Sequence, residues 1–499
     1  MHHVILGAGP AGVTAAETIR KTDPDCQITL VGGEPEPPYS RMAIPYLLAQ
    51  DIDESGTYLR QTDGHYENLG IQYVHGRAAS IDVAGKAIKL DDGGSIAFDK
   101  LLISTGATPV RPPIDGLDLP GVHHCWTMQD TRHIMATAQT GDPVVLMGAG
   151  FIGSIILEAL VRRGVALTVV EMGDRMVPRM MDEVAGNMLK RWCEKKGVRV
   201  LTSTKIMSLS SDGAAAPAAP PQPAPAPAAA APTPAAPAAA PKKEKYGFLQ
   251  WLFGNPVRPE DRPTHNAAPE AAPAPVAAPP VTPASLAPVG ASSAPGGMLS
   301  VQLDNGESIP AKLVVVAAGV RSNIDFLEGS GIKTEEGIWV DEYLQTNVPD
   351  IYAAGDVAEG IDLSTGEREM LAIQPVAVEH GRVAGQNMAG KSTYHRGSLN
   401  MNVLDTLGLI SSSFGSWMGV EGGESGRMVD EENDRYLRLE FSGDKLVGMQ
   451  SVGTTEHVGM ARGLIQTGLG LGEWKERLIA SPARLPEAYV AVGQGHLPL

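Results

Sequence analysis

Apolar residues gather in two stretches of the chain that share one order of elements. In the clearer stretch, the apolar run Val144–Met147 precedes a glycine-rich turn, and Ala166–Val170 forms a second apolar run. Between them, Ile155, Ile156 and Leu160 follow helical spacing. Short apolar runs bounded by turn residues are typical of buried strands, and a spacing of three to four residues is typical of a helix. The pattern predicts a strand–helix–strand unit.

The turn in this unit has a GxGxxG sequence, Gly148-Ala-Gly150-Phe151-Ile152-Gly153. The first glycine allows a tight turn, the second lets backbone N–H groups approach a pyrophosphate, and the third lets helix and strand pack closely. The pyrophosphate then lies at the positive end of the helix. Glu171 closes the second strand, where a carboxylate accepts from a ribose 2′-hydroxyl and repels a 2′-phosphate. The unit therefore predicts an NADH site rather than an NADPH site.

The chain begins with a second copy of this signature. His3–Leu6 is the predicted strand, and Gly7-Ala-Gly9-Pro10-Ala11-Gly12 is the turn. Val13–Arg20 is the predicted helix, Ile28–Val31 the return strand, and Glu34 the acid that follows. Two complete signatures indicate two bound nucleotides. The usual pair is FAD with a nicotinamide dinucleotide, because a hydride must pass from one ring to the other.

Composition narrows the class of protein. With 499 residues, the chain is long enough for two to four domains, and its net charge of −17 argues against nucleic acid as a partner. No apolar run reaches the roughly 18–20 residues that span a bilayer, and strand-like sequence at the start leaves no room for a signal peptide. The three cysteines are far apart. We therefore expect a cytoplasmic protein without disulfides.

Four further stretches carry a family resemblance: Pro38–Arg41, Leu101–Ala107, Leu313–Arg321 and Thr346–Asp356. With the two glycine signatures, in this order, they resemble the FAD- and NADH-dependent pyridine nucleotide–disulfide oxidoreductases. The most similar branch contains NADH oxidases, coenzyme A disulfide reductases, rubredoxin reductases and the FAD/NADH part of nitrite reductases. The resemblance implies further cofactor contacts at Arg41, Ala78, Thr105, Gly106, Gly319, Gly355 and Asp356.

The resemblance also implies an α/β fold with two Rossmann-like nucleotide-binding domains and a C-terminal α+β interface domain. The FAD domain would comprise residues 1–112 and 326–393, the NADH domain 113–325, and the interface domain 394–499. In the last of these, Tyr436–Phe441 and Leu446–Val452 read as a hairpin, and a helix is expected from about Glu456. In the family this domain commonly forms a homodimer. The helix Pro375–Met388 would direct its positive end at the flavin.

An Ala/Pro-rich insertion, residues 213–297, interrupts the NADH domain between the strand-like stretches Lys205–Leu209 and Leu299–Leu303. Its composition cannot bury a core and is typical of a disordered segment. A hairpin tip tolerates such a loop, because closure entropy grows slowly with length. Inside it lies an aromatic and leucine-rich island, Tyr246–Phe253. It is either a remnant of a longer domain or a motif that docks on a partner or a membrane surface.

The family's redox cysteines are missing from their usual places. There is no CxxxxC pair, and Met42 stands where coenzyme A disulfide reductases have the reactive cysteine of a Ser-Cys-Gly-Ile-Pro-Tyr motif. A thioether forms neither a thiolate nor a sulfenic acid. Ile155 replaces a glutamate that many relatives place near the nicotinamide, so the seating of that ring stays open.

The remaining candidates for site chemistry are weaker. His123-His124-Cys125 contains metal-binding residue types, but neighbours in sequence converge poorly on one ion, so no metal site is predicted. Cys26 and Cys193 are expected to be structural, and Cys125 has no partner cysteine for a sulfide:quinone-type reaction.

Without a redox cysteine, the flavin itself must pass electrons on. The first interpretation is an NADH-dependent FAD reductase that supplies a rubredoxin- or ferredoxin-like carrier. The alternatives are a reductase of a small molecule, such as oxygen or a quinone, and a regulatory or scaffold flavoprotein.

Overall fold

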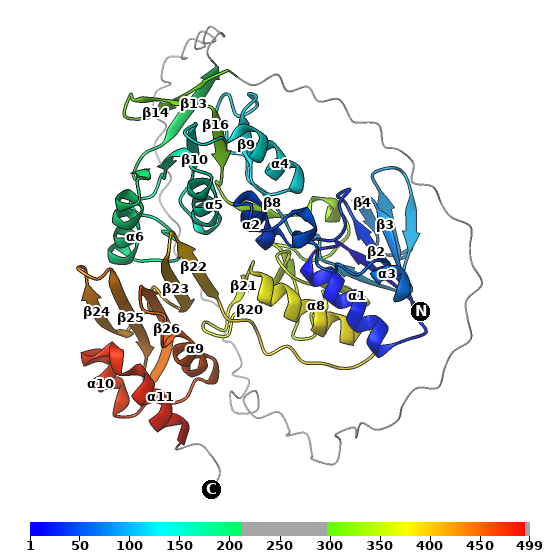
Figure 1. The fold of residues 1–499 in the computed structure, drawn as a ribbon. Helices are drawn as coiled ribbons and strands as arrows, with labels where there is room; N and C mark the ends of the chain where they lie inside the picture. Colours follow the sequence, from blue (N-terminus) through cyan, green and yellow to red (C-terminus); the bar gives the residue numbers. More distant parts are fainter. Residues whose placement is uncertain (212–296, 495–499) are drawn as a thin grey trace, which may run out of the picture. The chain divides into compact units, whose positions relative to one another are not determined.

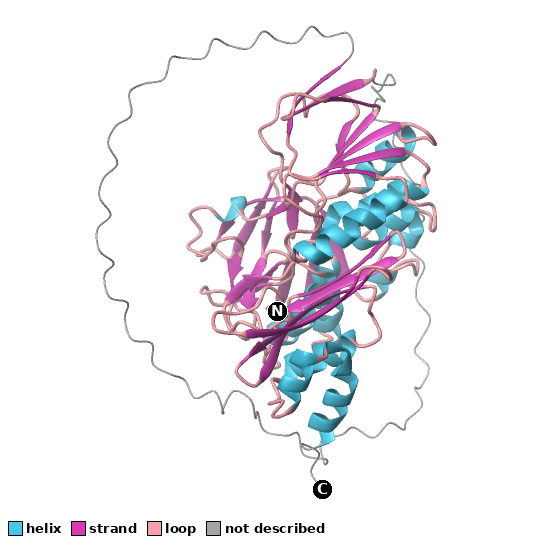
Figure 2. Cartoon of the chain, turned by 90° about the vertical axis from the view of Figure 1, so that its left-hand side faces the viewer, coloured by secondary structure: helices cyan, strands magenta, loops and turns pink. Residues whose placement is uncertain are grey.

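The computed structural model describes residues 1–211 and 297–494. Within them, two parallel sheets and one antiparallel sheet, of five strands each, are accompanied by smaller sheets and by helices (Figures 1 and 2). Nearly all of the insertion, including Tyr246–Phe253, lies outside the described residues. Among the described helices, none combines the length and the apolar character that a membrane crossing requires.

The first parallel sheet has the strand order β19-β7-β1-β2-β3. Because β19 comes from much later in the chain than its neighbour β7, two separate stretches of sequence build this sheet. Its strands are β1 (His2–Leu6), β2 (Gln27–Gly32), β3 (Ile71–His75), β7 (Lys100–Ile103) and β19 (Ile351–Ala353). Two small sheets accompany it, made of β4 (Ala78–Asp82), β5 (Ala87–Leu90) and β6 (Ser95–Ala97), and of β18 (Ile338–Trp339), β20 (Ala358–Ile361) and β21 (Arg368–Met370).

Helices α1 (Pro10–Thr22) and α8 (Gln374–Met388) pack closely together beside this sheet. The close approach requires glycine, since a Cβ at Gly381 would collide with the carbonyl oxygen of Ala11. A proline in the first turn begins α8, and Gly390, with φ of +87°, follows its end. The predicted helix Pro375–Met388 is confirmed to within one residue.

The second parallel sheet has the order β12-β11-β10-β16-β9. Its strands are β9 (Val122–His124), β10 (Pro143–Met147), β11 (Ala166–Val170), β12 (Arg199–Leu201) and β16 (Leu313–Val316), with helices α4 (Met128–Thr137), α5 (Phe151–Arg162) and α6 (Glu183–Lys195). Next to it, β13 (Ile206–Ser211), β14 (Leu299–Leu303) and β15 (Ser308–Ala311) form an antiparallel sheet. Ser211 pairs with Leu299, so the strands flanking the insertion are neighbours, as predicted.

The C-terminal sheet is antiparallel, in the order β22-β23-β26-β25-β24. Its strands are β22 (Met401–Thr406), β23 (Leu409–Gly415), β24 (Glu424–Asp430), β25 (Arg435–Ser442) and β26 (Lys445–Val452), and the helices that follow are α9 (Val458–Thr467), α10 (Trp474–Ala480) and α11 (Leu485–Gln494). These helices lie together against the sheet (Figure 2). The predicted hairpin is confirmed, with Tyr436 paired to Val452.

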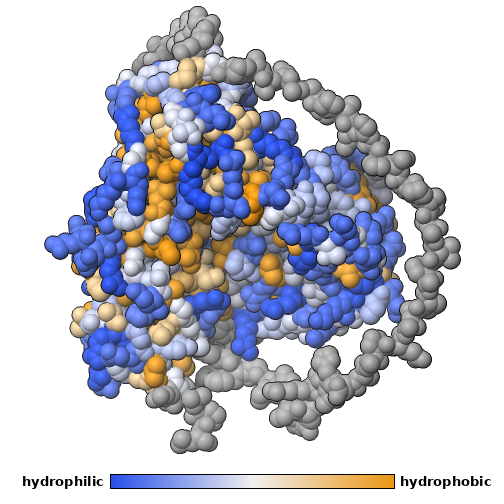
Figure 3. Space-filling model, in the orientation of Figure 1, coloured by the Kyte–Doolittle hydropathy of each residue, from blue (hydrophilic) through white to orange (hydrophobic). Residues whose placement is uncertain are grey.

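The C-terminal sheet is joined to the second parallel sheet by a shared apolar core and a polar cluster. Leu404 and Val452 are buried in one cluster with Leu157 and Leu160 of α5. Asp182, which caps α6, accepts hydrogen bonds from Tyr436 Oη and from Arg438 Nη1, the latter at 3.1 Å. On the face shown in Figure 3, apolar residues gather over the region of β10, α5 and β22.

Candidate functional site

The glycine turn after β1 has the geometry of an open cradle. Gly7 has φ of +105°, and a Cβ there would overlap the carbonyl oxygen of Ser104. A Cβ at Gly12 would likewise overlap the carbonyl oxygen of Gly7. At Gly9 the outcome is opposite, because no atom lies within 4 Å of the position that a Cβ would take. Two glycines thus pack against protein, and the middle one faces open space at the start of α1.

The turn after β10 repeats this arrangement. Gly148 has φ of +99°, and a Cβ there would lie 2.5 Å from the carbonyl oxygen of Ala317. A Cβ at Gly153 would overlap the carbonyl oxygen of Gly148, whereas nothing lies within 4 Å of one at Gly150. Each open glycine directly precedes a helix, α1 or α5, whose free N–H groups attract a phosphate. Both cradles therefore fit a dinucleotide pyrophosphate.

The acids that follow the two cradles have different surroundings. Glu171 is 9% exposed, and its two carboxylate oxygens accept from the backbone N–H groups of Ala149 and Gly173, each at 2.6 Å. It therefore holds the second cradle in shape, a role that the sequence analysis did not foresee. Glu34 instead accepts from Tyr39 Oη at 2.6 Å and from Arg41 Nη2 at 2.5 Å. Contact of either acid with a ribose stays a prediction.

Arg41 connects Glu34, which follows the first cradle, with the segment after β9. Besides Glu34, its guanidinium donates to the backbone oxygen of Trp126 at 2.6 Å and lies 5.1 Å from the centre of the Trp126 ring. Burial raises the pKa of Asp356, and the positive charge of Arg41 opposes that rise. Arg41 thus acts electrostatically on Asp356, although the two are more than 300 residues apart in sequence.

A buried histidine supports the loop that contains Asp356. Gly355, with φ of +75°, donates its N–H to Nδ1 of His380 on α8 at 3.4 Å. The other ring nitrogen lies 3.3 Å from Ser398 Oγ, which lies 3.4 Å from Nε2 of His395. Burial, and secondarily His395, lowers the pKa of His380 to about 3, so its ring is neutral at pH 7. The sequence analysis missed this network, because nothing local distinguishes His380 from an ordinary helix residue.

Two short strands connect the parallel sheets. β8 (Ala107–Pro109) and β17 (Val320–Ser322) pair antiparallel where the chain leaves and re-enters the first sheet. Asn323 fixes the crossing, since its Nδ2 donates to the carbonyl oxygen of Thr105 at 2.8 Å and its N–H donates to that of Gly106 at 2.9 Å. A Cβ at Gly106 or at Gly319 would meet nothing within 4 Å. Thr105 and Gly106 thus lie at the carboxyl edge of the first sheet, and Gly319 lies at that of the second sheet, at the other end of the β8–β17 pair.

A small apolar pocket lies beside the second cradle. Its lining comes from both crossing strands, from α5 and from the segment after β9, and comprises Pro109, Cys125, Trp126, Ile152, Ile156, Val316, Ala317, Gly319 and Val320. Ile155 packs against the neighbouring apolar cluster. The lining is largely apolar, and the space it encloses is about the size of one water molecule.

All three cysteines are buried. Cys26, Cys125 and Cys193 are 5%, 7% and 0% exposed, and burial raises the pKa of the Cys125 and Cys193 thiols to about 12. Burial also raises the pKa of Cys26. Met42 is 45% exposed in the turn Arg41–Ala43. A thiol with a raised pKa is a poor nucleophile at neutral pH.

The His123-His124-Cys125 stretch does not converge on one point. The His123 ring is tilted against that of His133, with ring centres 5.2 Å apart, whereas His124 Nδ1 lies 3.2 Å from the carbonyl oxygen of Val316. Across residues 1–211 and 297–494, this stretch contributes to no group of three potential metal ligands.

Comparison with known proteins identifies the family. The family model described as pyridine nucleotide-disulphide oxidoreductase matches residues 1–218 and 287–381. The chain belongs to this family. It is an NADH-dependent flavoprotein oxidoreductase, and its cofactors are FAD and NADH. The two-nucleotide fold expected from the sequence is confirmed.

Relatives within this oxidoreductase family match most of the chain. Subunit epsilon of the NADH-dependent phenylglyoxylate dehydrogenase of Aromatoleum evansii is 26% identical, over 96% of this chain and 95% of its own length. The rubredoxin-NAD(+) reductase of Pseudomonas putida is 24% identical, over 78% and 80%. The crystal structure of a covalent putidaredoxin reductase–putidaredoxin complex shares the fold, with a TM-score of 0.75 and 18% identity over 99% of both chains.

Proposed function

We propose that this oxidoreductase passes electrons from NADH through FAD directly to an electron-carrier protein, without a redox-active cysteine. One observation carries the proposal: Met42 occupies the exposed turn of the flavin-lining segment, while every cysteine of the chain is buried. A relay through sulfur needs a thiolate that the flavin and the acceptor can both reach. Relatives named as rubredoxin-NAD(+) and rhodocoxin reductases support a carrier protein as the acceptor.

The two cradles divide the cofactors between them in this proposal. We assign FAD to a domain of residues 1–112 and 326–393 and NADH to residues 113–325, with residues 394–499 as the interface domain. FAD is held by Gly7, Gly9, Pro10, Ala11, Gly12, Glu34, Arg41, Ala78, Thr105, Gly106, Gly355 and Asp356. NADH is held by Gly148, Gly150, Phe151, Ile152, Gly153, Glu171 and Gly319.

Bound FAD supplies the chemistry, because it accepts a hydride from NADH and releases electrons singly or in pairs. The chain's own residues hold the two cofactors in position. Asp356 accepts from a cofactor hydroxyl, Arg41 balances negative charge between the domains, and the N-terminus of α8 adds a positive dipole. Trp126 and Ile152 would present apolar surface beside the second cradle, where the nicotinamide is proposed to lie.

The proposal that no cysteine takes part in electron transfer is tested by alkylation during turnover. The holoenzyme, reduced anaerobically with NADH, is treated with iodoacetamide and compared with untreated enzyme. We expect unchanged carrier-reducing activity and no labelled cysteine in the folded protein. Loss of activity that follows the labelling of one cysteine would refute the proposal. The variant Cys125→Ala provides a second check, because Cys125 is the cysteine that lines the pocket.

The acceptor is tested with a panel of rubredoxins, ferredoxins, oxygen and quinones after anaerobic NADH reduction. Fast reoxidation by a carrier supports the proposal, and fast reoxidation by oxygen or a quinone alone favours a small-molecule reductase. Uniformly slow reoxidation favours a regulatory flavoprotein.

Deletion of residues 213–297 should spare flavin reduction by NADH and lower activity with the natural carrier if Tyr246–Phe253 docks it. Unchanged carrier activity would discard that docking role. A homodimer is part of the proposal and is tested by light scattering.

A second candidate role is that of an NADH module in a larger dehydrogenase. It is favoured by the match to the phenylglyoxylate dehydrogenase subunit, which covers nearly the full length of both chains. Electrons would then run from a reduced carrier subunit to NAD⁺. Co-purification from the native host with a 2-oxoacid-oxidising partner, and NAD⁺ reduction by that partner only when this chain is present, would support it.

A further inference from the structure

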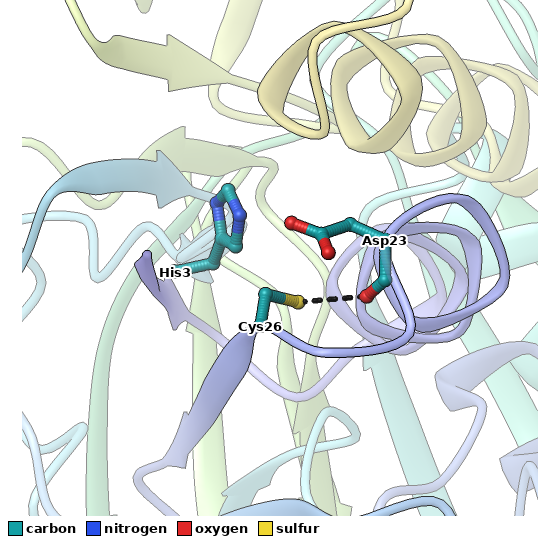
Figure 4. A group of neighbouring side chains, drawn as sticks. All are labelled: His3, Asp23 and Cys26. Carbon is teal, nitrogen blue, oxygen red and sulfur yellow. Dashed lines mark hydrogen bonds between the residues drawn. The ribbon is translucent and has the colours of Figure 1, made fainter.

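Three potential metal ligands meet at the end of the first sheet that lies away from its glycine cradle. His3 belongs to β1, Asp23 directly follows α1, and Cys26 directly precedes β2. One ring nitrogen of His3, a carboxylate oxygen of Asp23 and the Cys26 sulfur all lie within 4.8 Å of one another. Figure 4 shows the three side chains pointing toward one another from these separate elements. His3 is about 10 Å along β1 from Leu6, where the cradle begins.

His3 is the unusual member of this cluster. It is fully buried, and within the described part of the chain neither of its ring nitrogens has a hydrogen-bond partner. Leaving a buried polar group unpaired costs about 1–3 kcal/mol, so such a side chain calls for a ligand or another partner. The neighbouring His2 differs, since its Nε2 lies 2.9 Å from Thr29 Oγ1.

We propose that His3, Asp23 and Cys26 bind one zinc ion as three protein ligands, with water in the fourth position. Imidazole nitrogen, carboxylate oxygen and thiolate sulfur are the donors that zinc accepts in tetrahedral sites. Tetrahedral bonds of about 2.0–2.3 Å place the ligand atoms about 3.3–3.8 Å apart. Each pair therefore needs to close by about 1.5 Å at most, which side-chain rotation supplies.

Charged groups of both signs surround the cluster. Zinc binds a thiolate, so binding would release the proton of the Cys26 thiol to solvent. Arg20 Nη1 lies 4.0 Å from the Cys26 sulfur and favours the thiolate. Near His3, Lys100 and the N-terminal amino group are positive, whereas Asp23 and Asp99 are negative.

The proposed ion has a structural role. It would join the start of β1 to the short turn Asp23–Cys26, which connects the end of α1 with the start of β2. Cys26 Sγ now donates to the backbone oxygen of Asp23 at 3.1 Å, so the turn is closed before any ion binds. Zinc at this end of the sheet would raise the stability of the FAD-binding part without contacting either cofactor.

Metal content of the purified holoenzyme is the first test. We expect about one zinc per chain by mass spectrometry, little zinc in His3→Gln and Cys26→Ser, and unchanged zinc in the matched controls His2→Gln and Cys193→Ser. Both controls change the same residue types outside the cluster. Equal zinc in His3→Gln and wild type would overturn the assignment.

A second test avoids variants that fold poorly. Zinc is removed from the wild-type holoenzyme with a chelator and cobalt is added. We expect tetrahedral cobalt bands at wavelengths longer than the flavin absorbs, and a melting temperature that falls on chelation and returns with zinc. A wild-type protein that purifies without zinc, binds it no tighter than about 10 μM and shows no change in melting temperature would refute the proposal.

Discussion

Alanine substitutions at the equivalent positions of the two cradles should each impair the binding of a different cofactor. Gly9 and Gly150 have φ of −80° and −72°, which alanine adopts without strain, and a Cβ at either would meet no protein atom within 4 Å. Each substitution should therefore leave the fold intact and stabilise it by about 0.4–1 kcal/mol through the unfolded chain. The new methyl group would instead occupy the space through which the cradle approaches a pyrophosphate.

The expected losses follow from that geometry. Displacing a pyrophosphate from two charge-assisted hydrogen bonds costs about 3 kcal/mol in total, which corresponds to about 150-fold in affinity. Gly9→Ala should purify folded but nearly colourless, as measured by flavin absorbance and circular dichroism. Gly150→Ala should stay yellow and be reduced normally by dithionite, while its half-saturating NADH concentration rises by about 100-fold. Gly459→Ala, another position with nothing within 4 Å, is the matched control.

The assignment fails if the two effects are exchanged or absent. A Gly9→Ala protein with normal FAD content, or a Gly150→Ala protein that loses FAD and keeps its NADH affinity, would show that the cradles do not hold the nucleotides proposed for them.

Three further predictions concern the neighbouring residues. Met42→Cys should place a reactive thiol beside the flavin, seen as long-wavelength charge-transfer absorbance in the holoenzyme; a spectrum like wild type would place Met42 elsewhere. Glu171→Gln should break one of the two hydrogen bonds from Glu171 to the backbone of the second cradle, at a cost of about 1.5–3 kcal/mol. The half-saturating NADH concentration should then rise about 10- to 100-fold. Unchanged kinetics would show that Glu171 does not hold the cradle in its binding shape. The pKa of His380 is about 3 in the folded protein and 6.5 in the unfolded chain, so on acidification the unfolded chain takes up a proton first. The free energy of unfolding should therefore fall as the pH drops below 6.5, by about 2 kcal/mol at pH 5. His380→Gln should flatten that dependence of the unfolding midpoint, and an equal slope would contradict the reasoning.

Local patterns in the sequence were enough to predict the elements around the two glycine turns and the C-terminal hairpin. Both glycine turns and the hairpin of β25 and β26 follow from apolar spacing and turn residues. Such signals are local, because strand and helix periods repeat within a few residues. The pairing of β13 with β14 across the insertion was instead implied by the family resemblance. The two-domain order came from the family resemblance, since periodicity alone does not tell which strands share a sheet.

Contacts between distant residues were beyond this reasoning. The bond of Gly355 to His380, the contact of Arg41 with Trp126, and the meeting of His3 with Asp23 depend on which elements pack together. No repeat or spacing in the chain marks these pairs. For Glu171, the sequence placed an acid correctly at the end of a strand but could not show that both of its oxygens bind the backbone.

The absence of a sulfur relay is tested most directly by anaerobic titration of the oxidised holoenzyme with NADH. If the flavin is the sole redox group, about one NADH per FAD completes the reduction, because each NADH delivers two electrons. An endpoint near two NADH per FAD, with a second phase that leaves the flavin spectrum unchanged or adds a charge-transfer band, would reveal a redox-active sulfur and contradict the account.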